Sequence, residues 1–209
     1  MKNNILKLGI VLALYASLAC TALAVVEQFT GPIIEGHQSR QLQESQQDLF
    51  PEADAFTEIP LESFSTDVQK VNFTGAWQAR SGNRLLGVIL KVAGSSYGGK
   101  EAIVLVGIGS NLKIAGTRIL TLSDTPGLGA NAVKANYYVN KPEQITFPGQ
   151  FTGMAVSSSF DLTTLASDNE NTVIAITAST ITSRAITTMV KAAAQAGTTW
   201  LGSNSTGGN

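Results

Sequence analysis

The sequence has little of what metal centres and disulfide frameworks require. Its 209 residues include one cysteine and one histidine. Cys20 lies in an apolar N-terminal run and His37 in a polar segment, so neither a catalytic thiol nor a metal site is expected. Charged residues make up 14% of the chain and the formal net charge is −1, which argues against a nucleic-acid-binding protein. A serine hydrolase is not expected either, because Ser157–Ser159 are far in sequence from the lone histidine.

The N-terminal segment, residues 1–26, has the pattern of a membrane anchor. Lys2 and Lys7 precede an uncharged run, Leu8 to Val26, whose 19 residues would span about 28 Å as a helix. Lysines before the run and Glu27 after it predict a single-pass protein of the cell (inner) membrane with a cytoplasmic N-terminus and the bulk of the chain outside. A cleaved signal peptide is the alternative, since Ala22-Leu23-Ala24 is an acceptable cleavage site.

Residues 27–70 are acidic and are interpreted as a connector between the membrane and a domain. They hold nine of the fifteen Asp and Glu residues. The glutamine-rich stretch Gln38 to Gln47 predicts a polar helix that Pro51 would end. A solvated face is the simplest reading of these charges, and a docking surface for a partner is the other.

The segment after the connector predicts an antiparallel sheet. Leu85–Val92, Ala102–Ile108 and Leu112–Leu122 are rich in Val, Ile and Leu, and short glycine-containing turns join them. We therefore expect an α+β fold with one folded domain over residues 71–200, an antiparallel-rich sheet with packed helices, and a flexible tail over residues 201–209.

A cluster of hydroxyl side chains lies where a predicted strand gives way to a predicted helix. Residues 172–176 are mostly β-branched, and apolar residues from Ala185 onward recur at helical spacing until Gly197. Free backbone N–H groups and the helix dipole favour an anion at such a point, and a phosphate is the natural candidate. The alternative is that Thr180, Thr182 and Ser183 only cap the helix.

Four motifs occur in an order that resembles the FMN-binding domain family. They are Tyr97-Gly98-Gly99, then Asp124 to Gly129, then Gln150 to Met154, and last Thr177 to Ser183. The last is similar to the family's Ser/Thr-Gly-Ala-Thr-x-Ser/Thr-Ser/Thr signature, and the resemblance covers roughly residues 80–195. In layout the chain is most similar to G subunits of Rnf ion-translocating ferredoxin:NAD oxidoreductase complexes, with C subunits of sodium-pumping NADH:quinone reductases as near relatives.

The resemblance implies a covalent flavin. In the family, a flavin transferase joins FMN by a phosphoester to the second threonine of the signature, which corresponds to Thr180. Backbone amides rather than charges are then expected near the flavin ring. The other members of the Rnf complex in the membrane would be the partners, and electron transfer with no separate substrate chemistry would be the activity. The residues implied to bind the cofactor are Thr180, Thr177, Ser179, Thr182, Ser183, Thr125, Pro126, Gly127, Leu128, Gly129 and Tyr97.

Four positions depart from the family pattern. Ala178 replaces a glycine, Ser179 an alanine, and Ile174 a usual aspartate. Met154 replaces a lysine, which removes a cation from the expected neighbourhood of the flavin. Two alternative functions therefore stay open: a stand-alone extracytoplasmic flavoprotein that shuttles electrons, and a scaffold subunit that carries no flavin.

Overall fold

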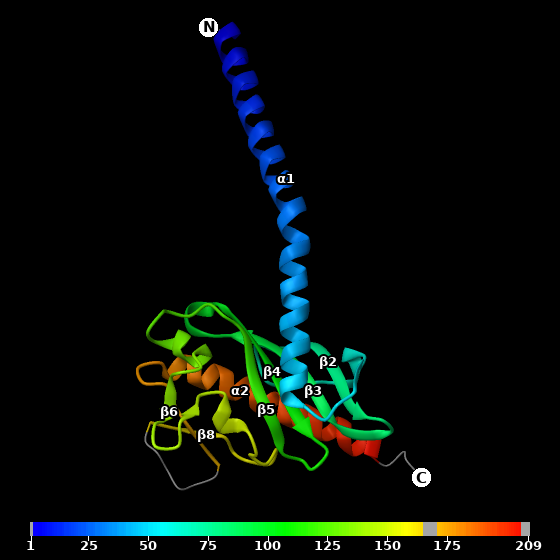
Figure 1. Cartoon of the computed structure of the whole chain (residues 1–209). Coiled ribbons are helices and arrows are strands. Elements are labelled where there is room, and N and C mark those ends of the chain that lie inside the picture. Colours follow the sequence, from blue (N-terminus) through cyan, green and yellow to red (C-terminus); the bar gives the residue numbers. More distant parts are fainter. Residues whose placement is uncertain (1, 165–170, 206–209) are drawn as a thin grey trace. The chain divides into compact units, whose positions relative to one another are not determined.

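The computed structural model describes residues 2–164 and 171–205, so residues 206–209 of the predicted tail lie outside this range. The chain divides into two units, residues 1–43 and residues 44–209, which we describe separately. The first unit is part of a single long helix, and the second contains the sheet and all other elements (Figure 1).

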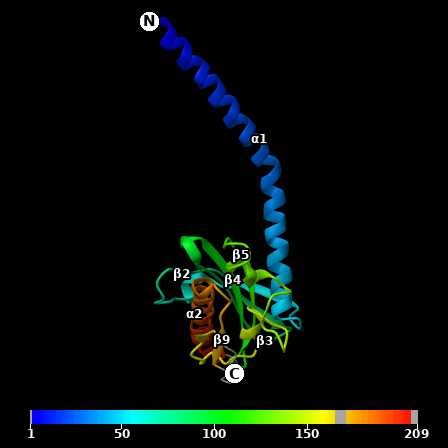
Figure 2. The ribbon, with the colours of Figure 1, turned by 90° about the vertical axis from the view of Figure 1, so that its left-hand side faces the viewer.

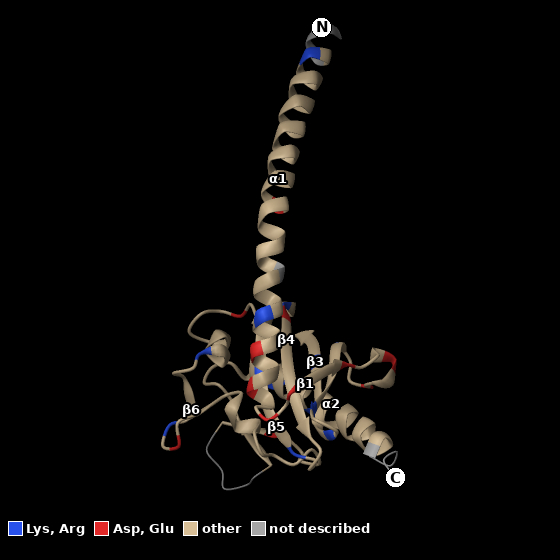
Figure 3. Cartoon of the chain, turned by 45° about the vertical axis from the view of Figure 1, so that its right-hand side comes forward, with Lys and Arg blue, Asp and Glu red and all other residues tan. Residues whose placement is uncertain are grey.

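Helix α1 spans Lys2–Leu49. It is continuous where the sequence suggested an anchor followed by a separate polar helix, even though Pro32 lies inside it. Its apolar part, within Leu6–Leu49, is long enough to cross a membrane, and Figure 3 shows a long stretch without charged residues below the basic N-terminal end. The large apolar side chains from Leu6 to Ile34 are exposed. The helix ends just before Phe50-Pro51, as the proline predicted.

A five-stranded antiparallel meander forms the centre of the second unit, with the strand order β1-β2-β3-β4-β5. The expected meander is confirmed, and two strands join it that the sequence did not predict. Of these, β1 comes from the expected connector, and β2 was obscured by the mixed polar and small residues around Gly75. The strands are β1 (Ala55–Glu58), β2 (Val71–Ser81), β3 (Arg84–Ser95), β4 (Glu101–Gly109) and β5 (Ile114–Leu122).

Helix α2, Thr180–Ser205, covers one face of this sheet. Alternate residues of β3 and β4, among them Val88, Leu90 and Val106, form a core with its apolar side. The helix does not end before Gly197, as the sequence suggested. Gly197 allows close packing instead, because an added Cβ would lie 2.9 Å from the Ile108 side chain. Trp200 and Leu201 continue the buried side, so residues 201–205 belong to the helix rather than to a tail.

The end of α1 is seated on the opposite face of the sheet. Figure 2 shows the strands between α2 and the last turn of α1. Leu49 and Phe50 are 4% and 7% exposed and lie over Gly87, Gly107 and Gly116 of three neighbouring strands. An added Cβ at Gly116 would be 2.8 Å from Leu49 Cδ2, so the glycines make room for the two side chains. Arg118 also donates to Asp48 at 3.4 Å.

The expected connector therefore differs from the structure in its second half. Residues 44–70 belong to the compact second unit. Ile59 and Phe64 are buried in the core, and Phe64 stacks against Trp200 with ring centroids 6.1 Å apart. The acidic composition hid these contacts because the charged residues occupy the exposed positions between the buried ones.

Short elements complete the unit and carry the loops that matter below. Strands β6 (Tyr138–Asn140) and β7 (Ile145–Thr146) form an antiparallel pair, and β8 (Asp161–Thr163) and β9 (Thr172–Ile174) form a parallel pair. Among the residues that the structure describes there are also four 3-10 turns, which are η1 (Leu61–Ser63), η2 (Tyr97–Gly99), η3 (Gly129–Val133) and η4 (Gly149–Phe151). The strand expected at residues 172–176 is β9, which ends at Ile174.

Candidate functional site

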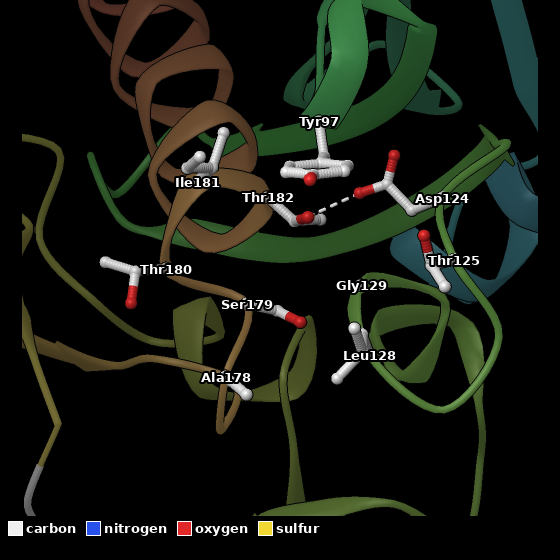
Figure 4. Close-up of a pocket in the computed structure, with 10 residues that line it drawn as sticks. All are labelled: Tyr97, Asp124, Thr125, Leu128, Gly129, Ala178, Ser179, Thr180, Ile181 and Thr182. Atoms are coloured by element: carbon white, nitrogen blue, oxygen red, sulfur yellow. Dashed lines mark hydrogen bonds between the residues drawn. The ribbon is translucent and has the colours of Figure 1, made fainter.

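Three segments far apart in the sequence meet around one cavity of about 390 Å³. They are the turn η2 between β3 and β4, the loop after β5, and the start of α2 (Figure 4). The volume of this cavity is within the usual size range of small-molecule pockets. The cavity is lined by Tyr97, Asp124, Thr125, Leu128, Gly129, Ala178, Ser179, Thr180, Ile181 and Thr182.

The hydroxyl cluster does lie at a helix start, and its members have different roles. The Ser183 hydroxyl is fully buried, accepts from the Ile176 N–H at 2.9 Å and donates to the Ser179 carbonyl at 2.9 Å. Ser183 therefore fixes the turn into α2 and does not line the cavity. The amides of the first helical turn, beginning at Thr180, have no partner within the helix, so the positive end of the helix dipole borders the cavity.

Ser179 supplies an unsatisfied polar group to the cavity. Ser179 is 7% exposed, and its hydroxyl has no hydrogen-bond partner among the residues that the structure describes. Figure 4 shows the Ser179 hydroxyl directed into the cavity, toward Leu128. Leaving a buried hydroxyl unpaired costs about 1–3 kcal/mol, so a ligand that bonds to it gains this energy. Thr180, by contrast, is exposed at the cavity edge, where its hydroxyl is accessible.

The loop after β5 gets its shape from a type II turn. Thr125 and Leu128 close the turn through a 3.1 Å main-chain bond, with Pro126 and Gly127 at its centre. Gly127 has φ +80°, which this turn type requires at its third residue. Asn131 donates to the Gly127 carbonyl at 2.8 Å and holds the turn against η3. Pro126 and Gly127 thus position Leu128 and Gly129 on the cavity without lining it themselves.

Asp124 is the functional candidate that the sequence reasoning missed. It is 7% exposed, accepts from the Ser96 hydroxyl at 2.5 Å, and also accepts from the Thr182 hydroxyl. One carboxylate thereby joins the η2 turn, the loop after β5 and helix α2. Asp124 also places a carboxyl group on the cavity, whereas the sequence analysis expected backbone amides rather than charges near a bound ring. An acidic residue placed directly before Thr-Pro-Gly was the available signal.

Several motif residues are structural. Thr177 is exposed and does not line the cavity. Gln150 bonds both the N–H and the carbonyl of Ile174, at 2.8 and 3.1 Å, and so holds β9. Met154 is 8% exposed and packs in the core, so the position where the family has lysine is not on this cavity. The replacement of lysine by Met154 therefore removes no cation from the residues that line this cavity.

Gly94–Gly98 has the Gly-x-Ser-x-Gly spacing of a hydrolase nucleophile, which the sequence reasoning overlooked. Its serine, Ser96, lies between two antiparallel strands rather than between a strand and a helix. Ser96 is buried and bonded to Asp124, and no histidine lines the cavity. The arrangement lacks the base that would activate a serine.

Ala178 adopts a backbone conformation that glycine prefers. Its φ is +58°, in the left-handed region, which costs a residue with a Cβ about 1 kcal/mol. We expect Ala178→Gly to raise the free energy of unfolding by up to about 1 kcal/mol, measured by urea titration. Ala185→Gly, inside α2, is the matched control and should lower it by about 1 kcal/mol. A loss at both positions would contradict the strain at Ala178.

Gly129 is required by the close approach of Asp124 and Thr182. A Cβ at Gly129 would overlap the Asp124 carboxylate and the Thr182 hydroxyl, which are hydrogen-bonded to each other. We expect Gly129→Ala to destabilise the domain by about 1–3 kcal/mol, measured by thermal unfolding. Gly202→Ala, also in α2 but with open space around its Cβ, is the control and should not lower the melting temperature. Equal melting temperatures for both variants would contradict this packing.

Comparison with known proteins agrees with the fold and with the family that the sequence resembles. The sequence model of the FMN-binding domain matches residues 97–195, and that of the RnfG N-terminal region matches residues 1–48. The NqrC protein of Shewanella oneidensis has a similar fold, with a TM-score of 0.50 and 14% sequence identity over 71% of this chain and 72% of that chain. These matches define the class: an FMN-binding domain that follows an apolar N-terminal helix.

Three curated relatives narrow the class. The G subunit of the proton-translocating ferredoxin:NAD(+) oxidoreductase complex of Clostridium ljungdahlii is 30% identical over 86% of this chain and 84% of the relative. The Na(+)-translocating counterpart of Acetobacterium woodii is 27% identical over 91% and 90%, and the G subunit of the ion-translocating oxidoreductase complex of Shewanella piezotolerans is 28% identical over 92% and 89%. The chain belongs to the family of G subunits of these ion-translocating Rnf complexes.

Proposed function

We propose that this chain is an electron-transfer subunit of a membrane-bound, ion-translocating ferredoxin:NAD oxidoreductase. Its relatives are named as subunits of such complexes, and the FMN-binding domain model covers all three segments of the cavity. When bound, FMN accepts and donates electrons, while the chain binds the cofactor, orients it and limits its contact with water.

The proposed cofactor is FMN, joined by a phosphoester to Thr180. One observation carries this proposal: an accessible threonine hydroxyl borders a cavity next to a helix N-terminus and an unpaired buried hydroxyl. The first-turn amides and Ser179 would hold the remaining phosphate oxygens. Tyr97, Leu128 and Ile181 give the cavity apolar walls that suit a planar ring. A flavin transferase would form the bond during maturation.

The proposed location is the cell membrane, with α1 as a single span. Lys2 and Lys7 at one end of the uncharged run favour a cytoplasmic N-terminus, which leaves the flavin domain on the extracytoplasmic side. A covalent bond suits that side, because a flavin lost outside the cell is not readily recovered. The other subunits of the complex would then deliver and accept the electrons.

The test is the natively produced protein, purified from membranes in mild detergent. Intact mass should show one FMN adduct, peptide mapping should locate it at Thr180, and polytopic subunits should co-purify. An FMN adduct without co-purifying subunits would favour the stand-alone shuttle. A colourless chain of unmodified mass would contradict the flavin assignment and favour a scaffold role.

A further inference from the structure

The cavity contains a negative charge that the proposed cofactor does not need for binding. Asp124 is the only one of its ten lining residues with an ionisable carboxyl or a basic side chain. A phosphate is itself anionic, so an acidic neighbour does not help to hold it. A role for Asp124 toward the other part of the flavin, the redox-active ring, would explain why a carboxylate is present here.

Two hydrogen bonds hold the Asp124 carboxyl group in place. Both of its oxygens accept from hydroxyl groups, one from Ser96 at 2.5 Å and one from Thr182. Within residues 2–164 and 171–205, Asp124 has no ion pair, and the nearby Lys100 ammonium bonds the Ser123 carbonyl at 2.8 Å. The charge is therefore buried without direct neutralisation by a cation.

We propose that Asp124 sets the reduction potential of the flavin by lowering it. This rests on the proposed function, since it requires a flavin in this cavity. Reduction adds two electrons from the preceding carrier and at least one proton to the flavin ring, so electron density on the ring rises. A fixed negative charge at the cavity wall disfavours that change, and the effect is strong where water is scarce. Asp124 is thus a positioning and potential-setting residue, not a catalytic one.

The test is a redox titration of flavin-loaded full-length protein followed by flavin absorbance. Asp124→Asn removes the charge and keeps the size. It should increase the equilibrium constant for two-electron reduction by about tenfold, which is an upward shift of about 30 mV. Asp124→Glu keeps the charge and should titrate like the unchanged protein. Asp161→Asn is the matched control, because Asp161 also accepts a serine hydroxyl at 2.5 Å but is exposed and outside the cavity.

Thr182→Val separates charge from packing, because it removes one hydrogen bond to Asp124 and leaves the carboxylate. An equal upward shift in Thr182→Val, or no shift in Asp124→Asn, would overturn the proposal. Should Asp124→Asn retain no flavin, Asp124→Glu and Asp124→Gln repeat the comparison. Equal potentials in that pair would also overturn the proposal, since the charge would then have no effect. Flavin in the Glu variant alone would overturn it too, since the carboxylate would then serve binding. Unchanged protein without flavin would instead contradict the proposed function itself.

Discussion

Thr180→Val is expected to abolish covalent flavin completely. Valine keeps the branched shape of threonine but has no hydroxyl to form the phosphoester. Because Thr180 is exposed at the start of α2, the change should alter the free energy of unfolding by no more than about 0.5 kcal/mol. The measurement is in-gel flavin fluorescence under denaturing conditions, together with intact mass, on protein produced with a flavin transferase.

Thr199→Val is the matched control for this experiment. Thr199 is an exposed threonine of the same helix that lies outside the cavity, so its variant should keep the fluorescent band. Fluorescence that persists in Thr180→Val would mean that another hydroxyl carries the flavin. Peptide mapping would then distinguish Ser179, which lines the cavity, from Thr177, which does not.

Phe50→Ala is expected to cause the largest loss of stability. The Phe50 ring is 7% exposed and occupies the space that Gly87 and Gly107 leave on the sheet. Removing it leaves a cavity that the glycines cannot fill, so the free energy of unfolding should fall by about 3–5 kcal/mol. For a domain of this size, the melting temperature would fall by roughly 10 °C. Urea titration of the full chain in detergent, followed by tryptophan fluorescence, measures the loss.

Phe56→Ala provides the comparison for Phe50→Ala. Phe56 is a half-buried phenylalanine on the edge strand β1, so its loss should cost about 1 kcal/mol. A similarly small cost for Phe50→Ala would mean that the end of α1 is not seated on the glycines. The expected difference implies that residues 44–50 belong to the folded domain and are not a passive connector.

Local sequence patterns were sufficient to predict much of the fold and to identify the motifs around the cavity. The Val- and Ile-rich strands β3, β4 and β5 and the short turns between them predict an antiparallel meander. Strand β2 and the last two turns of α2 were missed, because Gly75 and Gly197 weaken the local pattern at places where close packing requires glycine. The Thr-Pro-Gly turn could also be predicted from the sequence, since its φ angles follow from those residue types.

The roles of individual residues at the cavity could not be predicted from local sequence patterns. Thr180 and Ser183 have similar side chains three positions apart, yet one is exposed at the cavity and the other is buried as a helix-start hydrogen-bonding group. Residues three positions apart on a helix are neighbours on its surface, so helical spacing does not separate the two roles. Only the packing of α2 decides which hydroxyl is buried and which is exposed at the cavity. Asp124 was missed for the same reason, because its contacts with Ser96 and Thr182 depend on packing.

The sequence by itself determined the apolar helix, the antiparallel sheet, the hydroxyl-rich helix start and the family. Each depends on neighbours within a few residues or on a motif that is contiguous in the chain. Tertiary structure alone decided that Ser96 and Thr182 both bond the Asp124 carboxylate. It also decided that Leu49 and Phe50 pack against three glycines on separate strands. These contacts join residues far apart in sequence, and such contacts are fixed by how α2, α1 and the sheet pack rather than by local preference.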